Sequence, residues 1–241
     1  MNPSTREYTT SLILNPPEEL EGQRTYAIFG TRRGGTSMVA GVARALGLDL
    51  GEVGQRKNNE DPRFQNRPMP QMREAIEKRN AEHDVWGWKF PAAGNYIPEL
   101  SNSLRNPYLI VVYRDPVAAA LSQAKRDRAF NRRSTRLALH ESSANNAVNT
   151  GLALATDRPC LLVSNERAIA DPEGLIDDIA TFLGQEPPTG ALREKILAYI
   201  KPGQYKSFDE FFGEGGDAPA DSPSPDKERP GLLRRLRGDN S

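Results

Sequence analysis

The sequence predicts an α/β fold in three layers, with a mostly parallel β-sheet flanked by helices on both faces. Short apolar runs alternate with segments of helical periodicity along most of the chain, and a glycine-rich turn joins the first run to the first helix. Strands that alternate with helices pair in parallel, so the helices cover both faces of the sheet. A chain of 241 residues is long enough for one such domain with appendages.

The first half of the chain contains the first strand–turn–helix unit. The run TYAIF ends at Gly30, and SMVAGVARALGL carries apolar residues at helical spacing until Gly47. A polar stretch follows over residues 51–67. PMPQMREAIEKRNAE then predicts a helix, VWGWKF a short strand, and AAGNYIPELSNSL a partly helical segment.

The second half repeats this alternation. PYLIVVY is the plainest buried strand, and after it Asp115 is expected to cap a helix that has Pro116 at its first position. A further helix is predicted over residues 136–155, and PCLLVSNE reads as a strand. DPEGLIDDIATFLG predicts a capped amphipathic helix that ends at Gly184.

The two ends of the chain differ from this pattern. Residues 1–23 are polar and contain proline, which predicts an N-terminal arm whose SLIL segment lies against the domain formed by residues 24–212. Residues 213–241 have few apolar side chains and predict a disordered tail. Its basic end, GLLRRLRGD, allows two interpretations: a weak contact with an anionic membrane surface or acidic partner, or a solvated terminus without a role.

Composition excludes several classes of protein. Lysine plus arginine and aspartate plus glutamate both number 32, so net charge offers no argument for a nucleic-acid partner. The single cysteine, Cys160, excludes an internal disulfide and a Cys-rich metal site, and it is expected to be a buried core residue. No apolar run is long enough to span a bilayer, and the N-terminus lacks the pattern of a secretion signal. We therefore expect a cytoplasmic protein with no metal.

The turn in FGTRRGGTS is close to the phosphate-binding P-loop pattern. Gly30 and Gly35 have the required interval and Ser37 fills the hydroxyl position, but Thr36 stands where a lysine belongs. Backbone N–H groups at the start of a helix attract anions, whichever phosphate is bound. The nearest cations precede the glycine pair, so we expect a ligand with a different layout from Mg-ATP.

A second pair of residues follows the strand PYLIVVY. Arg114 comes directly after this strand, and Ser122 lies two turns into the next helix. Ligands of open α/β sheets bind at the carboxyl ends of the strands, so Arg114 and the Gly30 turn should open on the same crevice. The sequence therefore predicts one site that holds two separate anions.

These two motifs resemble the sulfotransferase family, whose donor is 3′-phosphoadenosine 5′-phosphosulfate (PAPS). RRGGTS is similar to a Lys-Gly-Gly-Thr variant of glycan-modifying members, VWGWKFP to a Trp-Gly-x-Lys-x-Pro segment, and VSNERAIADPEGLIDDIATFLG to the late strand and helix. The resemblance implies a P-loop NTPase-like sulfotransferase fold and sulfuryl transfer to a hydroxyl or amine of an unidentified acceptor, a carbohydrate or another small molecule. It assigns the 5′-phosphosulfate to Arg32, Arg33, Gly34, Gly35, Thr36 and Ser37, and the 3′-phosphate to Arg114 and Ser122.

The catalytic residues are less well indicated. Arg33 is the first choice, and Lys89 the second, to stabilise charge on the bridging oxygen. Many members carry a histidine two residues after this lysine, where the chain has Pro91. Because that histidine is missing, Glu60 is the first candidate base, and its polar segment is expected to lie at the surface.

Asp61, His83 and His140 are the next candidates for the base. Several of the residues singled out also have structural interpretations. Trp86 and Trp88 are expected in the core, Lys89 could be an edge lysine with its head in solvent, and Glu166 could orient a loop.

Two other functions stay open from the sequence. A small-molecule kinase that uses ATP would need an aspartate for Mg²⁺ at a strand end, and Asp115 is the candidate. A non-catalytic nucleotide-binding or scaffold protein would keep the fold but lack a base.

Overall fold

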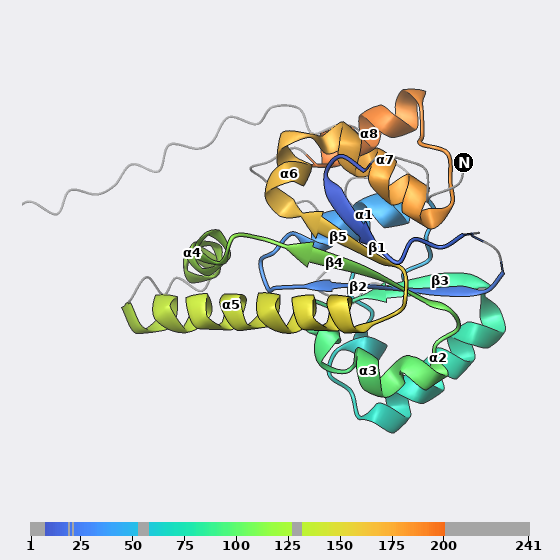
Figure 1. Ribbon diagram of the computed structural model, residues 1–241, viewed down its shortest axis with the longest axis horizontal. Helices are drawn as coiled ribbons and strands as arrows, with labels where there is room; N and C mark the ends of the chain where they lie inside the picture. The colour runs from blue at the N-terminus through green and yellow to red at the C-terminus, as the bar shows by residue number, and fades with distance from the viewer. Residues whose placement is uncertain (1–7, 19, 21, 53–57, 127–131, 201–241) are drawn as a thin grey trace, which may run out of the picture.

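The computed structural model describes residues 8–18, 20, 22–52, 58–126 and 132–200. They form a five-stranded sheet between two layers of helices, which confirms the predicted three-layer α/β class (Figure 1). The strand order is β1-β5-β4-β2-β3; β2 is parallel to β3 and β4, β4 is parallel to β5, and β1 is antiparallel to β5. The strands are β1 Ser11–Leu14, β2 Arg24–Gly30, β3 Val85–Lys89, β4 Pro107–Tyr113 and β5 Cys160–Ser164.

The helices divide between the two faces of the sheet. In Figure 1, α1, α6, α7 and α8 lie above the sheet, α2, α3 and α5 lie below it, and α4 lies beyond the end of β4. Their bounds are α1 Thr36–Ala45, α2 Met69–Glu82, α3 Ile97–Leu100, α4 Pro116–Arg126, α5 Arg132–Ala155, α6 Asn165–Ala170, α7 Pro172–Leu183 and α8 Gly190–Ile200, with short 3₁₀ turns at η2 Pro62–Phe64, η3 Ala93–Asn95 and η4 Ser101–Ser103.

Alternation along the central strands builds a separate core on each face. In β2, Tyr26 and Ile28 belong to the core under α1 and α7, whereas Ala27 and Phe29 belong to the core that contains Trp86. Successive side chains of a strand point to opposite faces, and a sheet covered on both sides buries both sets. This is why the runs TYAIF and PYLIVVY are apolar throughout.

The topology brings the predicted site to one edge of the sheet. The chain leaves β2 toward β3 on one side and later returns to β4 on the other, so the order of the strands reverses around β2. Ligands of open parallel sheets bind at such a reversal, outside the carboxyl ends of the strands. Gly30, Lys89 and Tyr113 end the three strands that meet there.

The structure also decides several smaller expectations. The SLIL segment pairs with β5 as an antiparallel edge strand, and α5 begins at Arg132, four residues before the predicted start. Trp86, Trp88 and Cys160 are fully buried, as expected, and burial raises the pKa of the Cys160 thiol to about 12. The predicted tail over residues 213–241 lies outside the described residues.

We expect Gly87→Ala to destabilise the fold by about 1–3 kcal/mol, because overpacking forces the backbone to shift. An added Cβ on Gly87 would lie 2.5 Å from the Tyr26 carbonyl oxygen of the paired strand. The control is Gly151→Ala, where a Cβ meets nothing within 4 Å and where alanine favours the helix. Urea unfolding should therefore show opposite changes in the two variants. Equal changes would mean that β2 and β3 are not this closely packed.

Candidate active site

The turn between β2 and α1 presents backbone N–H groups at the carboxyl edge of the sheet. Arg33 and Gly35 have left-handed φ values of 61° and 95°, and the Gly34 N–H donates to the Thr31 carbonyl at 3.0 Å. A Cβ on Gly34 would lie 2.7 Å from that carbonyl oxygen, so the turn requires glycine here. No described side chain caps the start of α1, which leaves the positive end of the helix dipole open to an anion.

Lys89 enters the site from the end of β3 and is buried, with 1% of its surface exposed. Its Nζ donates to Glu60 Oε1 at 2.6 Å, to Ser37 Oγ at 3.1 Å and to the Asn58 carbonyl at 3.3 Å. Burial lowers the pKa of Lys89, and the Glu60 carboxylate opposes this effect. The interpretation as an edge lysine in solvent is wrong, because three protein oxygens hold the ammonium inside.

Glu60 is also buried, with 8% exposed, so the expectation of a surface segment is wrong. The cause lies four residues later, where Phe64 is fully buried and stacks on Trp88 with ring centroids 5.0 Å apart. The Tyr96 hydroxyl donates to the Phe64 carbonyl at 2.8 Å. Because Phe64 anchors the segment in the core, Glu60 is drawn inward to Lys89.

Arg33, Arg114 and Ser122 converge on the other side of the turn. Arg114 Nη1 donates to the Arg33 carbonyl at 2.8 Å, and Arg33 Nε donates to Ser122 Oγ at 3.2 Å. The Nε of Arg114 is buried without a hydrogen-bond partner in the described part of the chain. Unpaired buried donors are rare, and this one lies beside the open turn, where an anion would satisfy it.

Asp115 and Glu166 have structural contacts, as the sequence indicated. The Ala118 N–H donates to Asp115 Oδ1 at 2.7 Å, which is the predicted helix cap. The Asp115 N–H in turn donates to Glu166 Oε1 at 3.0 Å. Glu166 therefore orients the connection between β4 and α4.

These elements surround a cavity of about 810 Å³. Among the described residues that line it, five have cationic side chains, and Glu60 is the one residue with a carboxylate side chain. The lining residues are Arg32, Arg33, Gly35, Thr36, Ser37, Met38, Asn58, Glu60, Asn66, Lys89, Phe90, Pro91, Ala92, Arg114 and Arg126. Gly34 and Ser122 are not among them, although Ser122 is bonded to the lining residue Arg33. The excess of positive charge suits an anionic ligand.

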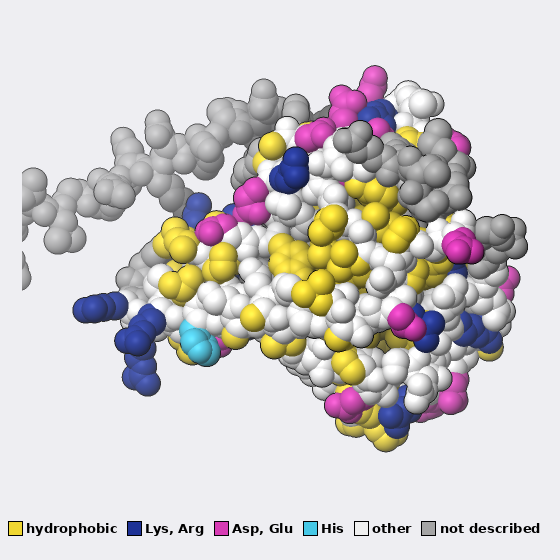
Figure 2. Space-filling model, viewed as in Figure 1, with side chains coloured by type: hydrophobic (Ala, Val, Ile, Leu, Met, Phe, Trp, Pro, Cys, Tyr) yellow, Lys and Arg dark blue, Asp and Glu magenta, His cyan; other side chains and the backbone are white. Residues whose placement is uncertain are grey.

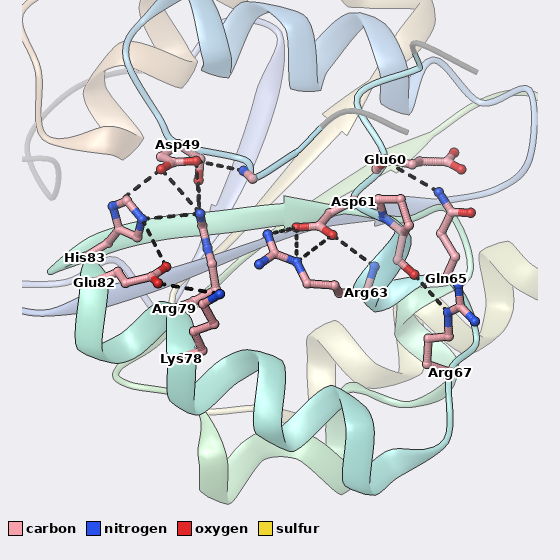
Figure 3. A network of polar contacts seen from close by, with 12 residues as sticks. Asp49, Glu60, Asp61, Arg63, Gln65, Arg67, Lys78, Arg79, Glu82 and His83 are labelled. Atoms are coloured by element: carbon pink, nitrogen blue, oxygen red, sulfur yellow. Dashed lines mark hydrogen bonds and ion pairs between the residues drawn. The ribbon is translucent and has the colours of Figure 1, made fainter. Parts of the chain in front are cut away.

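The three other candidate bases lie elsewhere. Figure 3 shows Asp61 held by Arg63, with a shortest contact of 2.6 Å, while the Glu60 carboxylate points away from this pair. His83 lies 3.4 Å from Asp49 at the amino end of β3, at the opposite edge of the sheet. His140 is exposed on α5. Of the four predicted acids and bases, the structure brings only Glu60 to the cavity.

Sequence reasoning missed some of the cavity wall. Arg126 follows Ser122 by four residues, so helical spacing could have indicated it. Asn58 contacts Lys89 through its backbone carbonyl. Phe90 and Asn66 line the cavity because the segments after β3 and α1 fold back over it. Residue type carries no signal for such contacts.

Two further properties concern the described residues alone. No three of their His, Cys, Asp and Glu side chains are grouped to hold a metal ion. No described helix is long and apolar enough to cross a membrane.

The fold and the cavity define an α/β protein in which an uncapped glycine turn before α1 lies beside a largely cationic cavity. The sequence profile of the sulfotransferase family matches residues 52–188, which is more than half of the chain, and the chain belongs to this family. No curated protein matches the sequence. A solved structure, the sulfotransferase domain of the olefin synthase from Synechococcus PCC 7002, is similar over 85% of this chain and 92% of its own, at 19% identity and a TM-score of 0.46.

We expect Lys89→Met to lower the free energy of unfolding by about 3–5 kcal/mol, because it leaves the buried Glu60 carboxylate without its cation. Adding Glu60→Gln should recover part of this loss, with a coupling of about 0.5–3 kcal/mol in a double-mutant cycle followed by urea unfolding.

The matched control for this cycle is Lys78→Met with Glu82→Gln, an exposed pair 3.9 Å apart on α2. Its coupling should stay below about 0.5 kcal/mol. A coupling this small at Lys89 and Glu60 would show that their ion pair is not buried in solution.

Proposed function

We propose that this protein is a PAPS-dependent sulfotransferase that transfers the sulfuryl group to a hydroxyl or amine of a small-molecule or carbohydrate acceptor. One observation carries the proposal: the buried Lys89–Glu60 pair opens on the same 810 Å³ cavity as the glycine turn and Arg114. A cation and a base next to an anion-binding turn are the groups that sulfuryl transfer requires.

The residues present fit the two anionic groups of PAPS. The uncapped start of α1, Ser37 and Lys89 would bind the 5′-phosphosulfate. Arg114, with its unpaired Nε, and Ser122 would bind the 3′-phosphate. Arg33 would link the glycine turn to the 3′-phosphate residues, since its carbonyl accepts from Arg114 and its side chain donates to Ser122.

Bound PAPS supplies the sulfuryl group and the 5′-phosphate that leaves with the bridging oxygen. Lys89 would stabilise the negative charge on that oxygen as its bond to sulfur breaks. Glu60 would accept the proton of the attacking hydroxyl or amine while the new bond to sulfur forms. The contacts favour Lys89 over Arg33 for the first task, because Lys89 bonds to both Ser37 and Glu60.

The same contacts weigh against the two alternatives. Asp115, the candidate Mg²⁺ ligand of a kinase, caps α4 and does not line the cavity. A scaffold protein without a base is disfavoured because Glu60 is inside the cavity and paired with a cation. The absence of the P-loop lysine also favours a donor other than Mg-ATP.

Calorimetry tests the donor directly. We expect adenosine 3′,5′-bisphosphate to bind without a divalent metal and to raise the melting temperature, since a ligand of the native state stabilises it by mass action. Arg114→Ala should weaken this binding by about 1.5–3 kcal/mol but leave adenosine 5′-phosphosulfate nearly unaffected.

Arg114→Lys should not restore the affinity, because an ammonium does not reproduce the guanidinium fork. Arg105→Ala is the control, since Arg105 donates to the Asn80 carbonyl and does not line the cavity. Binding of ADP only in the presence of Mg²⁺ would overturn the proposal in favour of a kinase. Equal losses for both adenosine ligands would show that Arg114 serves the fold.

Glu60→Gln should slow the release of adenosine 3′,5′-bisphosphate from PAPS, with water or an added alcohol as acceptor, by about 10²- to 10⁴-fold. Its affinity for adenosine 3′,5′-bisphosphate should remain, because the amide keeps an acceptor for Lys89. Glu77→Gln is the control, because Glu77 is exposed on α2 and does not line the cavity. Unchanged release in Glu60→Gln would exclude Glu60 as the base.

A further inference from the structure

We infer that Arg126 is a second guanidinium ligand for the 3′-phosphate, so that this group binds between Arg114 and Arg126 with Ser122 below it. The inference rests on the proposed function, because it concerns the same donor. It assigns to this chain a determinant of 3′-phosphate selectivity that lies at the last residue of α4.

The geometry of α4 places Arg126 beside Ser122. Residues four apart lie on the same face of a helix, one turn from each other. Helical side chains lean toward the N-terminus, so a long side chain covers the turn before its own Cα. This geometry predicts that the Arg126 side chain leans toward Ser122, whose Oγ already accepts from Arg33.

Arg126 is also free to bind a ligand. It lines the cavity and is exposed, and it makes no hydrogen bond or ion pair with any residue that the structure describes. Arg33 and Arg114 each use part of their donors within the protein. Arg32, the other cation of the cavity without a partner in the described part of the chain, belongs to the glycine turn rather than to α4. Arg126 is thus the cavity-lining cation of α4, and its guanidinium has no partner among the described residues.

The negative charge of the 3′-phosphate favours binding by a second guanidinium. A phosphate monoester carries between one and two negative charges at neutral pH, and planar guanidinium groups bind its oxygens in pairs. Arg114 cannot offer all of its N–H groups to the phosphate, because its Nη1 donates to the Arg33 carbonyl. A second arginine that lines the same cavity would complete the set of donors and distinguish 3′-phosphorylated nucleotides from those without this group.

A simpler role for Arg126 is a cation at the C-terminal end of a helix, where it interacts favourably with the dipole. Lys125 offers the matched control. It is adjacent, exposed and in the same last turn of α4, but it does not line the cavity. A dipole effect or a general electrostatic attraction would act through both residues, whereas a direct contact with the 3′-phosphate requires Arg126.

The experiment is calorimetry on the full chain with adenosine 3′,5′-bisphosphate and with adenosine 5′-phosphosulfate, which lacks the 3′-phosphate. Arg126→Ala should weaken the bisphosphate by about 10- to 100-fold, as expected for a charge-assisted contact, and change the phosphosulfate by less than about twofold. Lys125→Ala should change neither by more than about twofold. Arg126→Lys should recover only part of the affinity. Circular dichroism and melting temperatures establish that each variant is folded.

Several outcomes would overturn the inference. Equal losses for both ligands in Arg126→Ala, or equal losses in Lys125→Ala and Arg126→Ala, would show a general charge effect. An unchanged affinity in Arg126→Ala would show that the side chain does not reach the phosphate. If the unaltered protein does not bind adenosine 3′,5′-bisphosphate, the proposed function fails as well, and this result is distinct from a failure confined to Arg126.

Discussion

A buried ammonium must have oxygen partners, and the site depends on how Lys89 meets this requirement. Its partners come from the first turn of α1 and from the segment after it, so one cation connects Ser37, Asn58 and Glu60 to the end of β3. Desolvation of an unpaired charge would cost several kcal/mol, which these contacts offset. The same contacts keep a carboxylate and a cation side by side next to the glycine turn, where the proposed transfer would develop charge.

The parallel pairing of β2 with β3 and β4 provides the second constraint. It aligns Ile28 with Lys89 and Gly30 with Val112, so the glycine turn, Lys89 and Arg114 leave the sheet at the same edge. Arg33 connects the two halves, since it accepts from Arg114 through its backbone and donates to Ser122 through its side chain.

Much of the fold could be predicted because its signals are local. The apolar runs of β2 and β4 mark central strands, and Gly184 ends α7 with a left-handed φ of 79°, as a glycine after a helix should. The candidate site was predictable only in part. The interval from Arg114, together with the family resemblance, indicated Ser122, and helical spacing could have indicated Arg126. The polar sequence around Glu60 suggested a surface segment, because the burial of Phe64 against Trp88 has no local signature.

By itself, the sequence determined the α/β class, the alternation of the central strands with α1, α2, α4, α5 and α7, and the glycine turn with its missing lysine. It also carried the resemblance to sulfotransferases. These signals are local, because spacing and periodicity act over a few residues at a time. Only the tertiary structure decided which acid meets which cation. Asp61 and Glu60 are neighbours in sequence, yet Asp61 pairs with Arg63 while Glu60 pairs with Lys89, 29 residues away. Such pairings depend on which strands lie side by side and on which apolar residue anchors a loop, and these are properties of the packed chain.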